Sequence, residues 1–307
     1  MAQKKIVLAG GTGNIGKLLT NEFVKLGYQV LILSRRVQQS KNSNIKYVPW
    51  DGETKGAWVD ELEDVDTIIN LSGKSIQCRF TEENKKELLA SRILPTKVLG
   101  AAIVDLMHPP RLWINFSGIS VFEGLDGFHD EDSKDYAQTF LANLTKKWEE
   151  TFENSITPKT QKVILRLSPV LSKEFGMFKE LYPLAKFGLG GKVGNGQQNI
   201  SWIHESDLIA IVLWIINQEK VSNLYHACVP KPESNELFMQ TLRQAVSMPI
   251  GFPLPAFLAK IGAYFKGVES DMLLLTNAVE AKRLSQEGFI YKYPTTQKAF
   301  EHLTKEK

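Results

Sequence analysis

The sequence predicts an α/β fold, in which a doubly wound parallel sheet is followed by a smaller, mostly helical C-terminal cap. Short apolar runs alternate with longer segments of helical period through the first half of the chain, which is typical of βαβ units. These runs carry few charges, as expected of strands buried on both faces. Beyond residue 229 the sequence is rich in proline and mainly helical. We therefore predict a sheet domain over residues 1–228 and a cap over residues 229–307.

Seven apolar runs are predicted as strands. In order they are KIVLAG (5–10), QVLILS (29–34), IKYVPW (45–50), DTIINLSG (66–73), RLWINFSG (111–118), KVILRLS (162–168) and NLYHAC (223–228). Helical patterns between them cover residues 16–26, 81–107 and 138–152. In the last of these, Lys146 stands at helical spacing from Glu149 and Glu150, so this face is predicted to be solvated.

The composition argues against several classes of protein. The net charge is +3, from 37 basic and 34 acidic residues that are interspersed, so we expect no nucleic-acid partner. Cys78 and Cys228 have no second ligand at metal-binding spacing, and we expect buried free thiols, a reducing compartment and no metal. The longest apolar run, residues 208–216, is shorter than the roughly 20 residues of a membrane span. Since the start also lacks a signal-peptide pattern, we expect a cytoplasmic protein with no membrane partner.

The stretch LAGGTGNIGKLL (8–19) contains two overlapping glycine motifs, G-x-G-x-x-G and G-x-x-G-x-x-G. In such a loop one glycine permits a tight strand-to-helix turn, one lets a pyrophosphate approach the backbone, and one lets the helix pack on the strand. Because the motif follows a predicted strand and opens a predicted helix, it predicts a Rossmann-type dinucleotide site. The residues expected to bind the cofactor are Gly10, Thr12, Gly13, Asn14, Ile15 and Gly16.

The end of the second predicted strand indicates which dinucleotide binds. An Asp or Glu at this point would bond the ribose 2′-hydroxyl of NAD, whereas an Arg suits the 2′-phosphate of NADP. The chain has Ser34, Arg35 and Arg36 here, with no carboxylate beside them. Because arginine forms charge-assisted bonds to phosphate, these residues predict NADP(H) as the cofactor.

Several motifs together resemble a known family. They are GGTGNIG (10–16), SRR (34–36), INLSG (69–73), KELLASRILPT (86–96), LTKKWEE (144–150), FGLGGKVGNGQQ (187–198), WIHESDL (202–208) and GFIYKYPT (288–295). The chain resembles the atypical extended branch of the short-chain dehydrogenase/reductase superfamily, and within it the epimerase-family proteins of family 39U. The resemblance covers nearly the whole chain.

This resemblance implies further cofactor residues and a C-terminal cap over the nicotinamide end. Leu71, Ser72 and Gly73 would pass beside the adenosine, and Ser168, Pro169 and Val170 would lie beside the nicotinamide. Glu87 and Arg92 would approach the cofactor from their helix, although their sequence pattern alone indicates a solvated helix face. A segment near residues 170–200 would line the cleft.

The proton-transfer pair typical of the superfamily is missing. Active members carry Tyr-x-x-x-Lys on the helix after the fifth strand, and the family alignment puts Leu141 and Thr145 at these two positions. A literal Tyr-x-x-x-Lys at Tyr182 and Lys186 lies after the sixth strand and is interpreted as coincidental. The paired tyrosines that usually follow the serine stretch are replaced by Phe122 and Glu123. Ser117 and Ser120 are the candidate catalytic residues, with Tyr136 and His129 also near the same strand end.

Two functions remain open from the sequence. The first is an NADP-dependent oxidoreductase or nucleoside-diphosphate-sugar epimerase with a degenerate Tyr-x-x-x-Lys site and a non-standard acid/base group, acting on an unidentified small molecule. The second is an inactive NADP(H)-binding redox sensor or regulator, which would have a protein partner. Hydrolysis by a Ser-His-Asp triad is excluded because there is no G-x-S-x-G elbow.

Three structural roles are also predicted. His204 is expected to be a structural histidine, and Asp207 is expected to cap the helix that follows it. Trp148 and Trp202 are expected in the core or the cleft wall. Core packing is likewise predicted for the aromatic residues of the cap, Phe252, Phe257, Tyr264 and Phe265.

Overall fold

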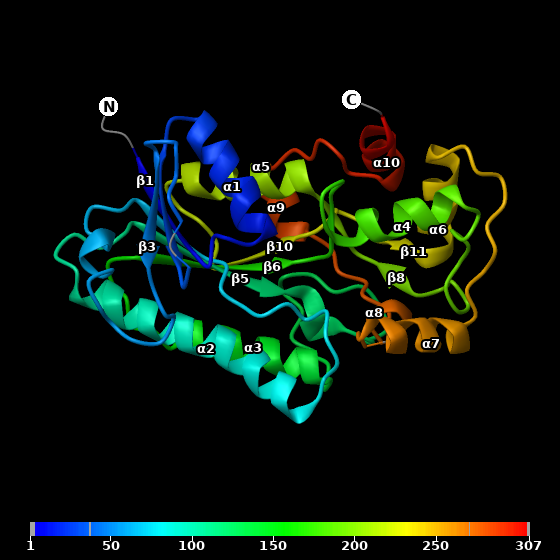
Figure 1. Ribbon diagram of the computed structural model, residues 1–307, viewed down its shortest axis with the longest axis horizontal. Helices are drawn as coiled ribbons and strands as arrows, with labels where there is room; N and C mark the ends of the chain where they lie inside the picture. Colours follow the sequence, from blue (N-terminus) through cyan, green and yellow to red (C-terminus); the bar gives the residue numbers. More distant parts are fainter. Residues whose placement is uncertain (1–3, 37, 270, 306–307) are drawn as a thin grey trace.

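A seven-stranded parallel sheet forms the centre of the molecule (Figure 1). The computed structural model describes residues 4–36, 38–269 and 271–305. The strand order is β10-β6-β5-β4-β1-β2-β3, and all seven predicted strands are confirmed. Their bounds are β1 (Lys5–Ala9), β2 (Gln29–Ser34), β3 (Ile45–Pro49), β4 (Thr67–Asn70), β5 (Leu112–Gly118), β6 (Gln161–Leu167) and β10 (Leu224–Ala227).

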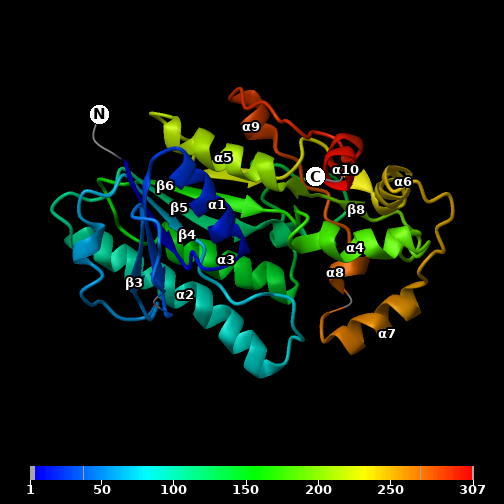
Figure 2. The same cartoon turned by 45° about the horizontal axis from the view of Figure 1, so that its top comes forward.

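Helices cover both faces of this sheet, which confirms the doubly wound α/β fold (Figures 1 and 2). α1 (Asn14–Lys25) and α5 (Glu205–Asn217) pack on one face, in a core with Leu8 and Ile32. α2 (Glu82–Asp105) and α3 (Phe140–Glu153) lie on the other. Two short 3-10 helices, η1 (Asp60–Leu62) and η2 (Ile119–Phe122), complete this part of the chain.

The three predicted helices are confirmed, with small shifts at their ends. Thr81 and Thr139 cap α2 and α3, since each side chain accepts a hydrogen bond from the backbone N–H three residues on. The capping threonines explain why these two helices begin where they do.

Most of the remaining elements gather beside one end of the sheet, whereas α9 (Lys282–Gln286) packs against β10 next to α5 (Figures 1 and 2). The other helices are α4 (Gly176–Lys186), α6 (Asn235–Ala245), α7 (Ala256–Lys266), α8 (Asp271–Leu274) and α10 (Thr296–Thr304). The short strands β7 (Val170–Leu171) and β9 (Ile203–His204) pair in parallel, and β8 (Asn199–Ile200) pairs with β11 (Glu233–Ser234) antiparallel. One apolar cluster joins side chains from residues 171–202 to side chains from residues 229–303. The boundary after residue 228 stays a prediction.

The predicted core role of the cap aromatics is wrong. Phe252 and Phe257 are each 63% exposed, Tyr264 is 64% exposed and Phe265 is 83% exposed. The physical reason for the three that lie on α7 is that this helix buries only its small residues, Ala259 and Ala263, and turns its large side chains outward, whereas Phe252 lies in the exposed turn before it.

The strand order reverses at β1, whose neighbours are β2 on one side and β4 on the other. In open parallel sheets, ligands bind in the crevice that such a reversal leaves at the carboxyl ends of the strands. The glycine loop follows β1 directly and therefore lies at this crevice. Within the residues described, no helix has the length and apolar character needed to span a membrane.

Candidate functional site

The glycine loop forms a tight turn between β1 and α1. Gly10 has a φ of +72°, and a Cβ there would lie 3.0 Å from the Cα of Ser72. A Cβ at Gly16 would lie 2.1 Å from the carbonyl oxygen of Gly11, so only glycine lets α1 pack this closely. At Gly13, in contrast, a Cβ would meet no atom within 4 Å. The N-terminus of α1 therefore faces open space that suits an anionic group.

A second feature of the loop fits a bound nucleotide. The hydroxyl of Ser72 is buried against Gly10 and has no hydrogen-bond partner among the described residues. A small cavity of about 120 Å³ opens beside the loop and is lined in part by Gly11, Thr12 and Lys17. Because buried hydroxyl groups are normally hydrogen-bonded, this one fits a hydrogen bond to a bound ligand.

The end of β2 places two guanidinium groups at the surface. Ser34 is buried, and its hydroxyl donates to the carbonyl of Arg36 at 3.0 Å and accepts from the N–H of Arg36 at 3.2 Å. Arg35 and Arg36 are exposed, and in the described part of the chain neither forms an ion pair. These groups have the charge and geometry for a phosphate.

The end of β4 is held by Arg92 from α2. The N–H of Leu71 donates to the carbonyl of Ala9, and the Arg92 guanidinium donates to the carbonyl of Lys74 at 3.0 Å. Burial lowers the pKa of Arg92 to about 10. The guanidinium also lies 3.2 Å from the place where a Cβ of Gly73 would be. Arg92 thus shapes the backbone next to the site and is no part of a solvated face.

Glu87 does lie on the solvated side of α2. It is mostly exposed and pairs with Lys74, whose backbone Arg92 holds. Its predicted approach to the cofactor stays a prediction.

The two positions of the missing proton-transfer pair are both occupied by tightly packed side chains. Leu141 is buried in a cluster with Leu88 and Leu144. Thr145 donates its hydroxyl to the carbonyl of Leu141 at 2.8 Å and lies 3.0 Å from the hydroxyl of Ser120. Neither Leu141 nor Thr145 offers a group that transfers protons near neutral pH.

Ser117 belongs to a buried charged network that the sequence analysis missed. Its hydroxyl donates to Oε1 of Glu149 at 2.6 Å. Arg166 forms a bidentate pair with the same carboxylate, from Nε to Oε1 at 2.9 Å and from Nη2 to Oε2 at 2.7 Å. Both charged side chains are less than a tenth exposed. The predicted solvated role of Glu149 is therefore wrong, because it faces the sheet one helical turn after Thr145.

One signal in the sequence pointed to this network. Arg166 is a charged residue in the second half of the apolar run KVILRLS, in a strand expected to be buried on both faces. A charge at such a position requires a buried partner. Nothing in the sequence identifies that partner, because β6 and α3 meet only in the fold.

The network continues from Arg166 to two further side chains. Its Nη2 donates to the hydroxyl of Tyr136 at 3.4 Å, and its Nη1 lies 3.5 Å from Nε2 of His226. Burial alone would lower the pKa of Arg166, but the hydrogen bond and charge of Glu149 raise it above its ordinary value. Burial and then Arg166 lower the pKa of His226 to about 3. Arg166 is thus a permanent cation, and His226 a neutral acceptor.

Tyr136 is the half-buried member of this group. Its ring lies 5.3 Å from the Cζ of Arg166 and 6.0 Å from the Nζ of Lys146. His129, the other candidate, is buried and stacks on Phe122 at 4.8 Å. Of these two side chains, Tyr136 is the better exposed to a substrate.

The segment expected beside the nicotinamide follows β6. Ser168 is buried and donates its hydroxyl to the carbonyl of Ala227 at 2.9 Å. Pro169 is exposed and accepts from the N–H of Ile203, and Val170 is buried. This segment lies at the carboxyl end of the strand that carries Arg166.

The roles predicted around WIHESDL are partly corrected. His204 is structural: its Nδ1 accepts from the N–H of Ser206, so His204 itself caps α5. Burial, then the charges of His302 and Lys292, lower the pKa of His204 to about 3. The predicted cap role of Asp207 is wrong, because its two oxygens accept from the backbone N–H groups of Lys292 and Tyr293. Asp207 holds the C-terminal segment onto α5.

The other predicted structural residues lie in the core. Trp148 and Trp202 are both buried. Cys228 is buried and Cys78 half-buried, and both are free. Tyr182 lies on α4 against the apolar cluster of residues 171–303, and Lys186 is exposed on the same helix with its Nζ 5.2 Å from the Tyr182 ring.

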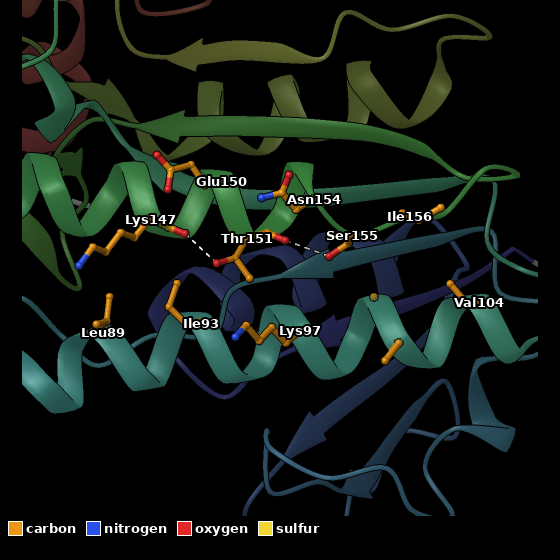
Figure 3. A pocket seen from close by; sticks show the side chains of 12 residues that line it. Leu89, Ile93, Lys97, Val104, Lys147, Glu150, Thr151, Asn154, Ser155 and Ile156 are labelled. Carbon is orange, nitrogen blue, oxygen red and sulfur yellow. Dashed lines mark hydrogen bonds between the residues drawn. The ribbon is translucent and has the colours of Figure 1, made fainter.

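A broad pocket of about 660 Å³ lies elsewhere, between α2 and α3 (Figure 3). Its lining includes Leu89, Ile93, Val104 and Glu150. No residue of the glycine loop or of the charged network lines it. Glu150 is one of the lining residues (Figure 3), whereas the adjacent Glu149 is buried and bonds to Ser117, so the pocket is separate from the candidate site.

Comparison with known proteins agrees with this architecture. Residues 6–228 match the NAD dependent epimerase/dehydratase family. An epimerase family protein of Staphylococcus aureus (strain N315) is 32% identical over 305 residues, which are 99% of this chain and 100% of that protein. The human epimerase family protein SDR39U1 (isoform 2), solved with NADPH, has a TM-score of 0.85 at 28% identity, over 98% of this chain and 99% of that chain. UDP-N-acetylglucosamine 4-epimerase from Bacillus cereus shares the fold, with a TM-score of 0.75 at 17% identity over 98% of each chain. The chain therefore belongs to the NAD dependent epimerase/dehydratase family, a short-chain dehydrogenase/reductase group that typically binds a nicotinamide cofactor.

Proposed function

We propose that this chain is an NADP(H)-dependent oxidoreductase or epimerase in which Tyr136 transfers the proton. The glycine loop, with open space at Gly13, would hold the pyrophosphate, and Arg35 and Arg36 would hold the 2′-phosphate. The NADPH in the structure of the human relative supports this choice of cofactor. When bound, the nicotinamide supplies or accepts a hydride.

The observation that carries the proposal is the chain of contacts Ser117–Glu149–Arg166–Tyr136 at the carboxyl ends of β5 and β6. Tyr136 would donate its phenolic proton to the substrate oxygen during reduction and recover it in the reverse direction. Arg166, fixed by Glu149, would stabilise the phenolate that remains. In the wider superfamily, a lysine stabilises the phenolate of the catalytic tyrosine.

The test is to follow NADPH fluorescence over a panel of ketones and aldehydes, and to follow epimer formation from sugar nucleotides directly, because an epimerase returns the hydride and leaves the NADPH concentration unchanged. Tyr136→Phe is expected to lower turnover by roughly 10²- to 10⁴-fold, the usual contribution of a general acid, with unchanged affinity for NADPH. The matched control, Tyr182→Phe on α4, is expected to retain wild-type turnover. Turnover by Tyr136→Phe at the wild-type rate would remove Tyr136 from the mechanism.

A second candidate is an NADP(H)-binding regulator without turnover. The packing of Leu141 and the hydrogen bond between Thr145 and Ser120 favour it, because they leave no proton donor at the usual positions. This alternative would be supported if the wild type shows no turnover and the Leu141→Tyr, Thr145→Lys double variant does. It would mean that the scaffold binds the cofactor but has lost its acid.

A further inference from the structure

Helix α7 turns its apolar side chains toward solvent. Ala259 and Ala263, one turn apart, are buried. The stripe opposite them consists of Phe257, Leu258, Ile261, Tyr264 and Phe265, which are between 43% and 83% exposed. This spacing of i, i+1, i+4, i+7 and i+8 is the pattern of a face that a helix buries. An exposed apolar stripe of this kind is typical of an interaction surface.

The stripe continues onto two neighbouring segments. The N–H of Phe252 donates to the carbonyl of Gly188 at 2.8 Å, so the turn before α7 lies against the loop that follows α4. The large apolar side chains of this turn and this loop, Phe187, Leu189, Ile250 and Phe252, are also more than half exposed. We define the α7 patch as Phe187, Leu189, Ile250, Phe252 and the five side chains of the stripe.

Contacts on both sides hold α7 in this orientation. Arg79 donates to the carbonyl of Tyr264 at 2.7 Å, and its Cζ lies 3.8 Å from the centre of the Tyr264 ring. At the end of the helix, Lys266 pairs with Glu180 of α4 at 2.7 Å. The helix lies at the edge of the molecule (Figure 2), with its outer side away from the sheet. These contacts fix the orientation of α7, and the Arg79 guanidinium lies over the ring of Tyr264, which belongs to the patch.

Lysines are the charged residues within the two segments that carry the patch. The segments that carry it, residues 181–198 and 247–268, contain four lysines and no Asp or Glu. Two of the lysines pair with carboxylates that border the patch, Lys266 with Glu180 and Lys192 with Glu236. Lys186 and Lys260 add positive charge with no carboxylate in either segment. The margin of the apolar patch therefore carries two lysines, Lys186 and Lys260, that form no ion pair among the described residues, beside two lysines that are neutralised by Glu180 and Glu236.

We propose that the α7 patch docks this protein onto an anionic lipid surface. Exposed Phe, Leu and Ile side chains beside lysines are what an interfacial helix uses, since the apolar side chains enter the headgroup boundary and the lysines attract acidic lipids. A second copy of the chain fits less well. In a two-fold interface the patch would face itself and would bring both copies of Lys186 and Lys260 to one apolar surface, while the bordering Glu180 and Glu236 already pair with Lys266 and Lys192.

This docking mode differs from the one that the sequence argued against. The expectation of no membrane partner rested on the absence of a spanning segment and of a signal peptide. A helix that lies in the plane of the interface needs neither. The proposal also does not depend on the proposed catalytic function, because the patch shares no residue with the cofactor site or the charged network.

The test is sedimentation of the full chain with vesicles of phosphatidylcholine alone or with about 30% phosphatidylglycerol. The protein is expected to pellet with the acidic vesicles and to be released as salt rises. Phe257→Ser, Phe265→Ser is expected to weaken this binding at least about tenfold by removing two apolar anchors. A matched double variant, Met107→Ser, Ile156→Ser, removes side chains that are 80% and 81% exposed elsewhere and is expected to bind as the wild type does.

Far-UV circular dichroism serves as the folding check for both double variants, and both spectra are expected to match that of the wild type. Wild-type protein that stays in the supernatant with the acidic vesicles overturns the proposal. So does equal loss of binding in the two double variants. A wild-type dimer in light scattering that Phe257→Ser, Phe265→Ser converts to a monomer, without vesicle binding, would assign the patch to a second copy instead.

Discussion

Arg166 and Glu149 form a bidentate ion pair that is almost fully buried beneath the carboxyl ends of β5 and β6. The pair joins a strand to the helix α3, and it also accepts the hydroxyl hydrogen bond of Ser117. Removing one partner of such a pair leaves an uncompensated charge in the core.

Glu149→Gln is therefore expected to destabilise the fold by about 3 to 5 kcal/mol, because Arg166 keeps its charge and loses its anion. Denaturant unfolding measures this change. The control is Glu150→Gln, one residue along α3 on the exposed side, with an expected change of no more than about 0.5 kcal/mol. Equal stability of the two variants would mean that the ion pair contributes little.

The next prediction separates two glycines of the loop. Gly13→Val is expected to abolish NADPH binding and leave the fold intact, because its side chain enters open space that the pyrophosphate needs. Gly16→Val is expected to lose both fold stability and binding, since its Cβ would meet the backbone of Gly11 at 2.1 Å. Circular dichroism and calorimetry distinguish the two. Wild-type NADPH affinity in Gly13→Val would make the loop purely structural.

A pH dependence of stability follows from His226. Burial and then Arg166 lower its pKa from 6.5 to about 3 in the folded protein. As pH falls below 6.5, His226 of the unfolded chain binds a proton that the folded chain does not bind. The contribution of His226 to the free energy of unfolding is therefore fully present above pH 6.5 and is lost as pH falls toward 3. The slope from this one group is about 1.4 kcal/mol per pH unit.

The check is to measure unfolding free energies from pH 7 to pH 4.5 in His226→Gln. This variant is expected to lose that part of the slope, whatever its stability at pH 7. The control, His108→Gln, replaces an exposed histidine and is expected to keep the wild-type slope. Identical slopes in wild type and His226→Gln would contradict a neutral buried His226.

Much of the fold could be predicted because its signals are local. Each strand of the sheet is a short apolar run, and the glycine loop combines a turn with the start of a helix. The charged network is not local: Glu149 has the helical charge spacing of a solvated face, and only the fold places Arg166 opposite it. Asp207 is expected from the sequence to cap the next helix, but α5 begins at Glu205, so His204 occupies the cap position and Asp207 accepts from the backbone of Lys292 and Tyr293.

Helix α7 shows a different limit. Its apolar stripe has the periodicity of a core-facing helix, and periodicity gives the width of an apolar face but not what covers it. The small residues Ala259 and Ala263 were the better indication, since they allow the close approach by which α7 lies against the body of the protein.

We propose above all that this chain binds NADP(H), and isothermal calorimetry with NADPH and NADH tests this proposal most directly. We predict tighter binding of NADPH by the wild type. Arg35→Ala is expected to weaken NADPH binding by about 1.5 to 3 kcal/mol, roughly ten- to a hundredfold, through loss of a charge-assisted bond to the 2′-phosphate, with little change for NADH. Equal affinity of the wild type for the two nucleotides, unaltered by Arg35→Ala, would contradict the account.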